Sequence, residues 1–186
     1  MSRESGATVE PYQVFFENEY VRLVNVTLAP GEAAPRYNPA SQKTVAIDFN
    51  DSGRARYFKG TPPEQHSRSD KSIRELRVEL KSRPRVESTP LDAIRLQPWR
   101  FKVEFENDQV RIVRLRFEAH EKGIMVHHPP RVLATITEVA VKLKFADGYT
   151  DERGAPAGVA AWLEAETLQT ENARDEPFEV VLVEPK

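Results

Sequence analysis

The amino-acid sequence predicts an all-β protein built from two related units. A segment near the start recurs later in the chain, apolar and polar residues alternate with a period of two, and turn-forming residues separate the alternating runs. Alternation with this period places successive side chains on opposite faces of a strand. Many short strands separated by Gly, Pro, Asn and Asp are typical of a sandwich or a barrel.

The repeat defines the two units. Residues 14–24 and 103–113 are identical at seven of eleven positions with an offset of 89, and residues 70–81 match 175–186 more weakly with an offset of 105. The second unit is therefore 16 residues longer between these anchors, about the length of one β-hairpin. We expect an N-terminal tail at 1–11, a unit at 12–81 shortened by about one hairpin, a proline-containing linker at 82–100 and a full unit at 101–186.

Strand-like alternation occurs in both units. It covers residues 24–28 in the first unit and residues 113–117 and 133–145 in the second. Turn-forming residues follow such runs at three places, namely 29–32, 50–53 and 146–148.

Two segments have helix-like features. Residues 158–172 have a helix-forming composition, and Ile73, Leu76 and Leu80 have helical spacing. The repeat matches the second of these segments to residues 178–183, which are rich in β-forming residues. We therefore predict a strand there, and we also keep a strand for residues 159–168.

Composition excludes several functional classes. The 27 basic and 29 acidic residues give a net charge of −2, which argues against nucleic-acid binding by phosphate neutralisation and against a polybasic membrane-surface protein. The absence of cysteine removes disulfides, thiolate zinc sites and Fe–S clusters. Because there is no bilayer-length apolar run and no secretory signal at the N-terminus, we expect a cytoplasmic protein.

The order of segments in the second unit resembles the cupin superfamily. In the first unit, residues 28–32 match the turn that precedes the metal motif of that family. The resemblance implies a double-stranded β-helix, or jelly-roll barrel, in each unit, and hence a small two-cupin (bicupin) protein. The segments of the second unit that carry the likeness are 106–114, 128–132, 144–148, 157–162 and 176–184.

The resemblance also implies a metal site, and most of its ligands are missing. Cupins bind a divalent metal through a His-x-His pair, a glutamate and a later histidine, since side chains at i and i+2 of a strand point to the same face. When the sequences are aligned on His-Pro, His128 takes the second histidine position, Val126 takes the first, and His127 points outward. The later histidine position falls near Leu168, and Glu138 is too far along the chain for the glutamate.

The first unit has even fewer candidate ligands. Its motif region, residues 35–39, has no histidine, and His66 lies two or three residues out of register with the later position. We therefore expect a degenerate site without a cofactor. If a metal does bind, the resemblance implies Fe, Mn, Ni or Zn, and the weak candidate ligands are His128, His127 and His120.

Two classes of function remain open. In the first, the protein is non-catalytic, and it binds a small molecule or has a structural or interaction role. The candidate pocket residues are then His128, His127, Arg131, Tyr37 and Tyr57, because arginine and tyrosine bind carboxylates and phosphates. The alternative for these residues is an amphipathic surface at the barrel rim.

In the second class, the protein is a metal-dependent cupin enzyme of the dioxygenase or isomerase type, with a remodelled site around His128. A histidine base needs an orienting carboxylate within reach, and the sequence does not identify one. We expect a small-molecule ligand as one partner. The missing hairpin leaves sheet edges in the first unit, and we expect them to be covered either by the full unit or by a second copy of the chain, in a homodimer through barrel edge strands. We expect no nucleic acid and no membrane as partners.

Overall fold

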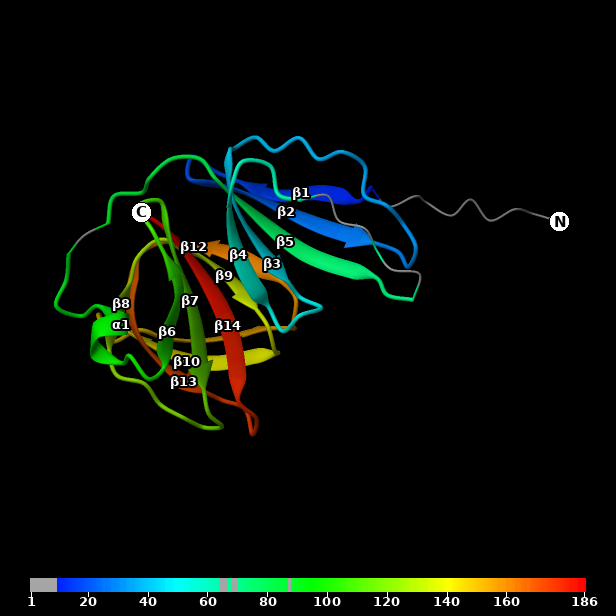
Figure 1. The fold of residues 1–186 in the computed structure, drawn as a ribbon. Coiled ribbons are helices and arrows are strands. Elements are labelled where there is room, and N and C mark those ends of the chain that lie inside the picture. The colour runs from blue at the N-terminus through cyan, green and yellow to red at the C-terminus, as the bar shows by residue number, and fades with distance from the viewer. Residues whose placement is uncertain (1–9, 64–66, 68–69, 87) are drawn as a thin grey trace.

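The structure is a computed structural model that describes residues 10–63, 67, 70–86 and 88–186. These residues form fourteen strands and one short helix, and the strands form three antiparallel sheets (Figure 1). The predicted all-β jelly-roll fold is confirmed. Within the described ranges, no helix has both the length and the hydrophobicity needed to cross a membrane.

The first unit forms a single five-stranded sheet in the order β1-β2-β5-β3-β4. Its strands are β1 (Tyr12–Glu17), β2 (Val21–Leu28), β3 (Lys43–Asp48), β4 (Arg54–Lys59) and β5 (Ile73–Leu80). The segment 70–81 therefore contains a strand, as the repeat predicts.

The second unit forms two sheets that close into a barrel. The first has five strands in the order β12-β9-β14-β7-β6, and the second has four strands in the order β11-β10-β13-β8. The strands are β6 (Phe101–Glu106), β7 (Val110–Phe117), β8 (Val126–His128), β9 (Arg131–Thr135), β10 (Val139–Phe145), β11 (Thr150–Ala155), β12 (Ala160–Leu163), β13 (Glu166–Asn172) and β14 (Phe178–Pro185).

The two five-stranded sheets have the same topology. Strands β1, β2, β3, β4 and β5 correspond to β6, β7, β9, β12 and β14 in both chain order and sheet order. The chain makes a short turn between β3 and β4, whereas the β10–β11 hairpin lies between β9 and β12. The described part of the first unit therefore lacks a counterpart of this hairpin, at the place where the repeat predicts a shorter chain. It also has no strands corresponding to β8 and β13, so the difference between the units exceeds one hairpin. The jelly-roll barrel that the resemblance implies for each unit closes only in the second unit, and the described part of the first unit is a single sheet.

The two five-stranded sheets pack face to face and share one hydrophobic core. Tyr57 on β4 stacks on Phe105 of β6 with ring centroids 5.5 Å apart, and Trp162, the repeat equivalent of Tyr57, stacks on Tyr20 at 5.6 Å. Equivalent aromatic residues of the two units therefore each stack on a residue of the other unit, as in a two-fold symmetric interface. The core contains six pairs of repeat-equivalent residues: Val21 and Val110, Leu23 and Ile112, Val45 and Val132, Ile47 and Ala134, Leu76 and Val181, and Val78 and Val183.

Strand β14 separates two cores. It pairs with both β7 and β9 at the centre of its sheet. Val181 and Val183 pack against the first unit, while Val180 and Leu182 belong to the core inside the barrel. The centre of this five-stranded sheet is therefore buried on both faces, whereas its edge strand β6 is mostly exposed.

The structure differs from the sequence analysis in one strand and adds a helix. The alternating run 133–145 is not one strand, because the chain passes at residues 136–138 from β9 in one sheet to β10 in the other. The linker contains a one-turn helix, α1 (Ala93–Leu96), whose first turn is capped by the Asp92 carboxylate accepting the Arg95 N–H at 2.8 Å. The helix-forming composition of 158–172 gives strands β12 and β13, as predicted.

Candidate functional site

The barrel encloses a cavity of about 230 Å³ between its two sheets. Polar groups on its wall include His128, Arg131, Arg153 and Glu166. An apolar cavity with a few convergent polar groups is the usual form of a small-molecule site. The rest of the lining is mostly apolar and includes Leu115, Leu133, Val139, Val141, Leu143, Leu168, Phe178, Val180 and Leu182.

Arg131 and Glu166 form the central ion pair among these polar groups. Arg131 is buried, and its Nη2 donates to Glu166 Oε1 at 2.7 Å while its Nη1 donates to the Pro129 carbonyl at 3.2 Å. Glu166 lies directly opposite His128 in the pairing of β13 with β8. The Arg153 guanidinium is 3.7 Å from Glu166, so two cations share one carboxylate.

Two buried polar atoms in this region have no hydrogen-bond partner in the part of the chain that the structure describes: His128 Nδ1 and Arg131 Nε. Burial holds the pKa of His128 well below its ordinary value of 6.5, and the charges of Arg131 and His127 lower it further. His128 is therefore a neutral ring at pH 7. An unpaired buried polar group costs about 1–3 kcal/mol, so both atoms favour a bound molecule that hydrogen-bonds to them.

The structure separates the residues that the sequence suggested as one pocket. His128 and Arg131 line the cavity, whereas His127 points to the other side of β8 with its Nδ1 2.9 Å from Thr167 Oγ1. Tyr37 is buried in the first unit, with its ring 4.6 Å from that of Tyr12. Tyr57 packs in the core between the units. Neither tyrosine lines the cavity, because the sheet of the first unit packs against the outside of the barrel.

The positions that bind a metal in cupins do not suit a cation in this chain. Val126 lies opposite Leu168 in the β8–β13 pairing, so two of the aligned positions carry apolar side chains on adjacent strands. His128 supplies one imidazole, whereas Zn²⁺ and similar ions take three or four protein ligands. Among the described residues, no three His, Cys, Asp or Glu side chains converge.

The other suggested ligands lie away from His128. Glu138 is exposed and forms an ion pair with Arg174 at 2.5 Å. His120 is also exposed, and its Nε2 is 2.8 Å from Asp175 Oδ1. His66 lies outside the described residues.

Sequence reasoning missed Glu166 and Arg153. Glu166 is the half-buried carboxylate that best meets the need for an orienting group, since it lies opposite His128 in the strand pair and binds Arg131. Its strand, β13, lies within the segment of helix-forming composition at 158–172, which hides the period-two signal. The pairing of β13 with β8 was needed to find it, and a single sequence does not give strand pairing.

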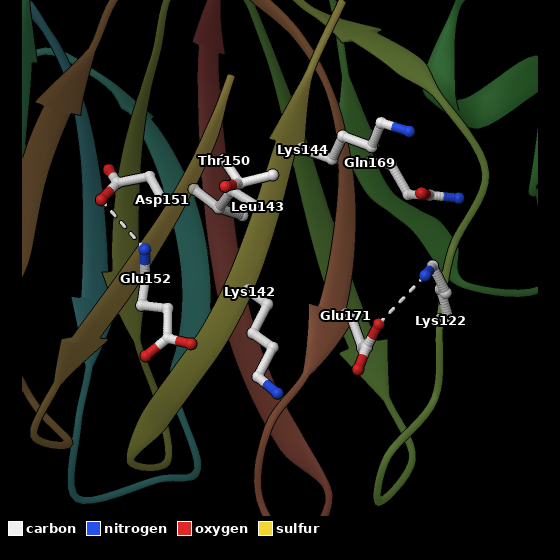
Figure 2. A pocket seen from close by; sticks show the side chains of 9 residues that line it. All are labelled: Lys122, Lys142, Leu143, Lys144, Thr150, Asp151, Glu152, Gln169 and Glu171. Atoms are coloured by element: carbon white, nitrogen blue, oxygen red, sulfur yellow. Dashed lines mark hydrogen bonds and ion pairs between the residues drawn. The ribbon is translucent and has the colours of Figure 1, made fainter. Parts of the chain in front are cut away.

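A second hollow lies on the outer surface of the four-stranded sheet. It has a volume of about 470 Å³, and Figure 2 shows its exposed lysines beside carboxylates. Lys122 is 3.2 Å from Glu171. Because three lysines face three carboxylates in this hollow, it has no excess charge that would select a ligand.

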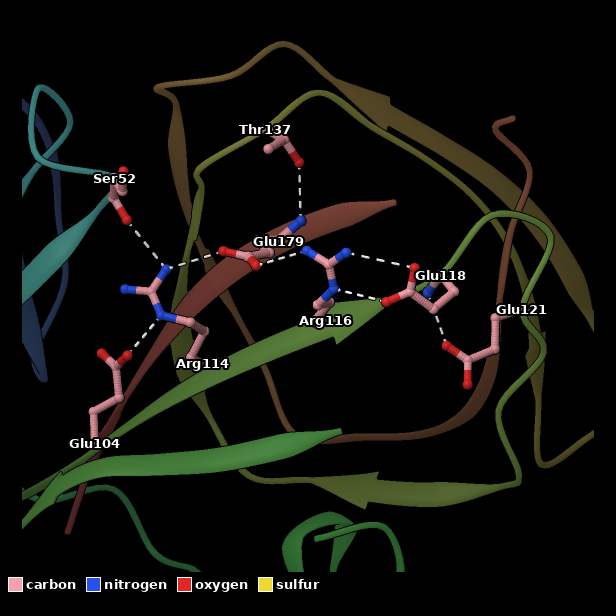
Figure 3. A network of polar contacts seen from close by, with 8 residues as sticks. All are labelled: Ser52, Glu104, Arg114, Arg116, Glu118, Glu121, Thr137 and Glu179. Carbon is pink, nitrogen blue, oxygen red and sulfur yellow. Dashed lines mark hydrogen bonds and ion pairs between the residues drawn. The ribbon is translucent and has the colours of Figure 1, made fainter. Parts of the chain in front are cut away.

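A charged network ties the two units together at the end of β7 (Figure 3). Arg114 donates to the backbone carbonyls of Ser52 and Gly53 in the first unit, at 3.2 and 3.1 Å. It also binds Glu104 at 2.6 Å and Glu179 at 3.3 Å. These contacts fix the β3–β4 turn of the first unit on the barrel.

Comparison with known proteins identifies the fold. No family model and no curated protein matches this sequence. Among solved structures, a cupin 2 conserved barrel domain protein from Leptotrichia buccalis aligns over 100% of this chain and 92% of its own, with 13% identity and a TM-score of 0.52. A cupin domain from Bordetella pertussis covers 46% of this chain and 91% of its own, with 22% identity and a TM-score of 0.43.

A third match is oxalate decarboxylase from Bacillus subtilis, which aligns over 89% of this chain and 68% of its own, with 13% identity and a TM-score of 0.45. Similarity at these identities establishes fold alone. Together with the jelly-roll barrel, the match to the Leptotrichia protein shows that this chain has the cupin superfamily fold.

Proposed function

We propose that the barrel of the second unit binds a small carboxylic acid with an apolar body, and that it does so without a metal. The observation that carries this proposal is the pair of unpartnered buried atoms, His128 Nδ1 and Arg131 Nε, beside an apolar cavity. The protein is then a degenerate two-cupin binding protein, and the first unit serves as its structural partner.

Charge favours an anionic head group. Among the described lining residues, Arg131 and Arg153 are the cations, Glu166 is the carboxylate, and His128 is neutral. Arg153 also pairs with Asp151 at 2.9 Å, whereas the buried Arg131 shares Glu166 with Arg153, so the charge of Arg131 is the one that is compensated least. A ligand carboxylate both neutralises this charge and accepts the Arg131 Nε–H.

Size and lining limit the rest of the ligand. A volume of about 230 Å³ lies below the range usual for drug-sized ligands and well above the space of one water molecule. The walls that surround it come from Leu, Val and Phe side chains. Short aliphatic and single-ring aromatic acids fit these limits.

The test is binding of hexanoate and benzoate to the full chain by calorimetry and by thermal unfolding. A ligand present at one hundred times its Kd stabilises the folded state by about 2.7 kcal/mol, which raises the Tm measurably. Hexanol and benzyl alcohol, which lack the carboxylate, should bind at least about tenfold more weakly, since hydrogen bonds to charged groups contribute about 1.5–3 kcal/mol.

Filling the cavity provides the matched control. Leu133→Trp places an indole in the cavity and should abolish carboxylate binding, whereas Ile124→Trp adds the same group at a position that is 49% exposed and should leave binding unchanged. Leu168→Phe offers a second cavity-filling change if the first variant does not fold. Binding that survives cavity filling, or no binding of any of these acids, contradicts the proposal.

A further inference from the structure

We propose a second ligand site, separate from the barrel cavity, in the cleft between the linker and the outer side of β8. This cleft has a volume of about 560 Å³ and is lined by linker residues and by the ends of β7, β8 and β14. Its ligand is a small molecule that carries a phosphate or carboxylate group. The lining residues used below are Arg83, Ser88, Asp92, Arg95, Arg111, His127, Glu184 and Lys186.

The walls of the cleft are held together by backbone contacts. The His127 N–H donates to the Leu91 carbonyl at 2.7 Å, and Asp92 forms a parallel bridge with His127. The Asp92 carboxylate caps α1, and Arg95 extends from that helix. A wall fixed to a barrel strand in this way keeps the binding groups in place before a ligand arrives, which lowers the cost of binding.

Most cations that line the cleft are paired with carboxylates. Arg83 pairs with Asp108 at 3.9 Å and Lys186 with Glu106 at 2.6 Å, and both of these carboxylates lie outside the lining. Glu184 is buried and binds Arg111 Nε at 2.6 Å, so this pair is internally neutral. Arg95 is the lining cation without a carboxylate partner among the described residues, and it favours an anion at the linker side of the cleft.

Three polar groups of the cleft have no partner within the described part of the chain. The exposed Arg95 guanidinium forms no ion pair or hydrogen bond with the described residues, and the exposed Ser88 hydroxyl forms no hydrogen bond with them. Thr167 binds His127 Nδ1, which leaves Nε2 as the nitrogen available to a ligand. A guanidinium, an imidazole nitrogen and a hydroxyl together match the acceptor oxygens of a phosphate or carboxylate.

This site is distinct from the barrel cavity because adjacent residues of a strand point to opposite faces. His128 faces the cavity and His127 faces the cleft. The cleft is also larger and more polar, and its volume is within the range usual for metabolite-sized ligands.

The experiment titrates the full chain with inorganic phosphate, pyrophosphate and citrate in a calorimeter. We expect at least one of the three to bind, and Arg95→Gln and His127→Gln each to weaken that binding about tenfold, as expected for loss of a charge-assisted hydrogen bond. Tighter binding of phosphate or pyrophosphate than of citrate would indicate a phosphate ligand, and tighter binding of citrate would indicate a carboxylate ligand.

Two control variants distinguish binding in the cleft from non-specific attraction and from binding in the barrel. Arg36→Gln removes the same charge from an exposed position elsewhere and should leave affinity unchanged, so an equal loss there would show non-specific attraction. Leu133→Trp fills the barrel and should also leave affinity unchanged, so a loss there would place the anion in the barrel. Either loss, or no binding of any of the three probes, overturns the proposal.

Discussion

Acid should destabilise this protein through His128. The folded state holds the pKa of His128 well below 6.5 by burial, whereas the unfolded chain takes up a proton near its ordinary pKa of 6.5. The contribution of His128 to stability is therefore fully present above pH 6.5 and is lost as the pH falls toward the folded pKa. Below 6.5 the loss approaches about 1.4 kcal/mol per pH unit, which gives about 1.4 kcal/mol between pH 7.5 and pH 5.5.

The assay is urea unfolding of the wild type and of His128→Gln at pH 7.5 and pH 5.5. Buried Glu184, whose pKa burial raises, is present in both proteins and acts in the opposite direction, because its folded form binds the proton more tightly. The difference between the two pH dependences therefore isolates His128. If the variant loses as much stability as the wild type over this interval, His128 is not buried as a neutral ring and the reasoning fails.

Three further predictions concern the junction and the metal. Gly53 has φ +69°, and a Cβ there would lie 2.1 Å from Ile136 Cδ1, so Gly53→Ala should cost about 2–4 kcal/mol from strain and overpacking. Gly60→Ala, with φ +108° and open space, should show the strain alone. Adding Ile136→Ala to Gly53→Ala should restore part of the lost stability, and strictly additive stability changes in the double variant would contradict the contact. Arg114→Gln should lower the free energy of unfolding by urea by about 1–3 kcal/mol. Arg116→Gln, at a side chain that is 48% exposed, should lower it by less than about 1 kcal/mol, and equal losses would contradict a role of Arg114 in joining the two units. Elemental analysis of protein purified without a histidine tag should find no stoichiometric Fe, Mn, Ni or Zn, and a metal that His128→Ala removes would sink the metal-free proposal.

The fold could be predicted because the repeated residues have the same local role in both units. Asn18 Oδ1 accepts the N–H groups of Tyr20 and Val21, and Asn107 Oδ1 accepts those of Gln109 and Val110. The arginine that follows pairs with a buried glutamate on the last strand of its unit, Arg22 with Glu79 at 3.5 Å and Arg111 with Glu184 at 2.6 Å. The asparagine contacts are local, and the arginine and the glutamate recur at equivalent positions of the two units, so the repeat is visible in the sequence although the pairing of its strands is not.

The site could be predicted only in part because it depends on which strands pair. Because His127 and His128 are adjacent residues of a strand, the sequence predicts that their side chains point to opposite faces, and the structure places them so. The apolar lining of the cavity, such as Leu133 and Leu168, has the same alternation as residues that pack solidly, so the sequence cannot distinguish a cavity from a core. The chemistry of Tyr37 and Tyr57 suits a ligand and so suggests a shared pocket with Arg131, but the first unit packs outside the barrel and separates both tyrosines from Arg131.

The double burial of β14 has a consequence for cooperativity. Its backbone hydrogen bonds to β7 and β9 open only when both cores open, so its amide protons should exchange with solvent among the slowest in the chain. A molecule in the barrel contacts Val180 and Leu182 on one side of the strand whose other side holds the first unit. Binding there should slow exchange across the sheet of the first unit too, and both units should melt in one transition. The first unit would then respond to the occupancy of a cavity that none of its own described residues lines.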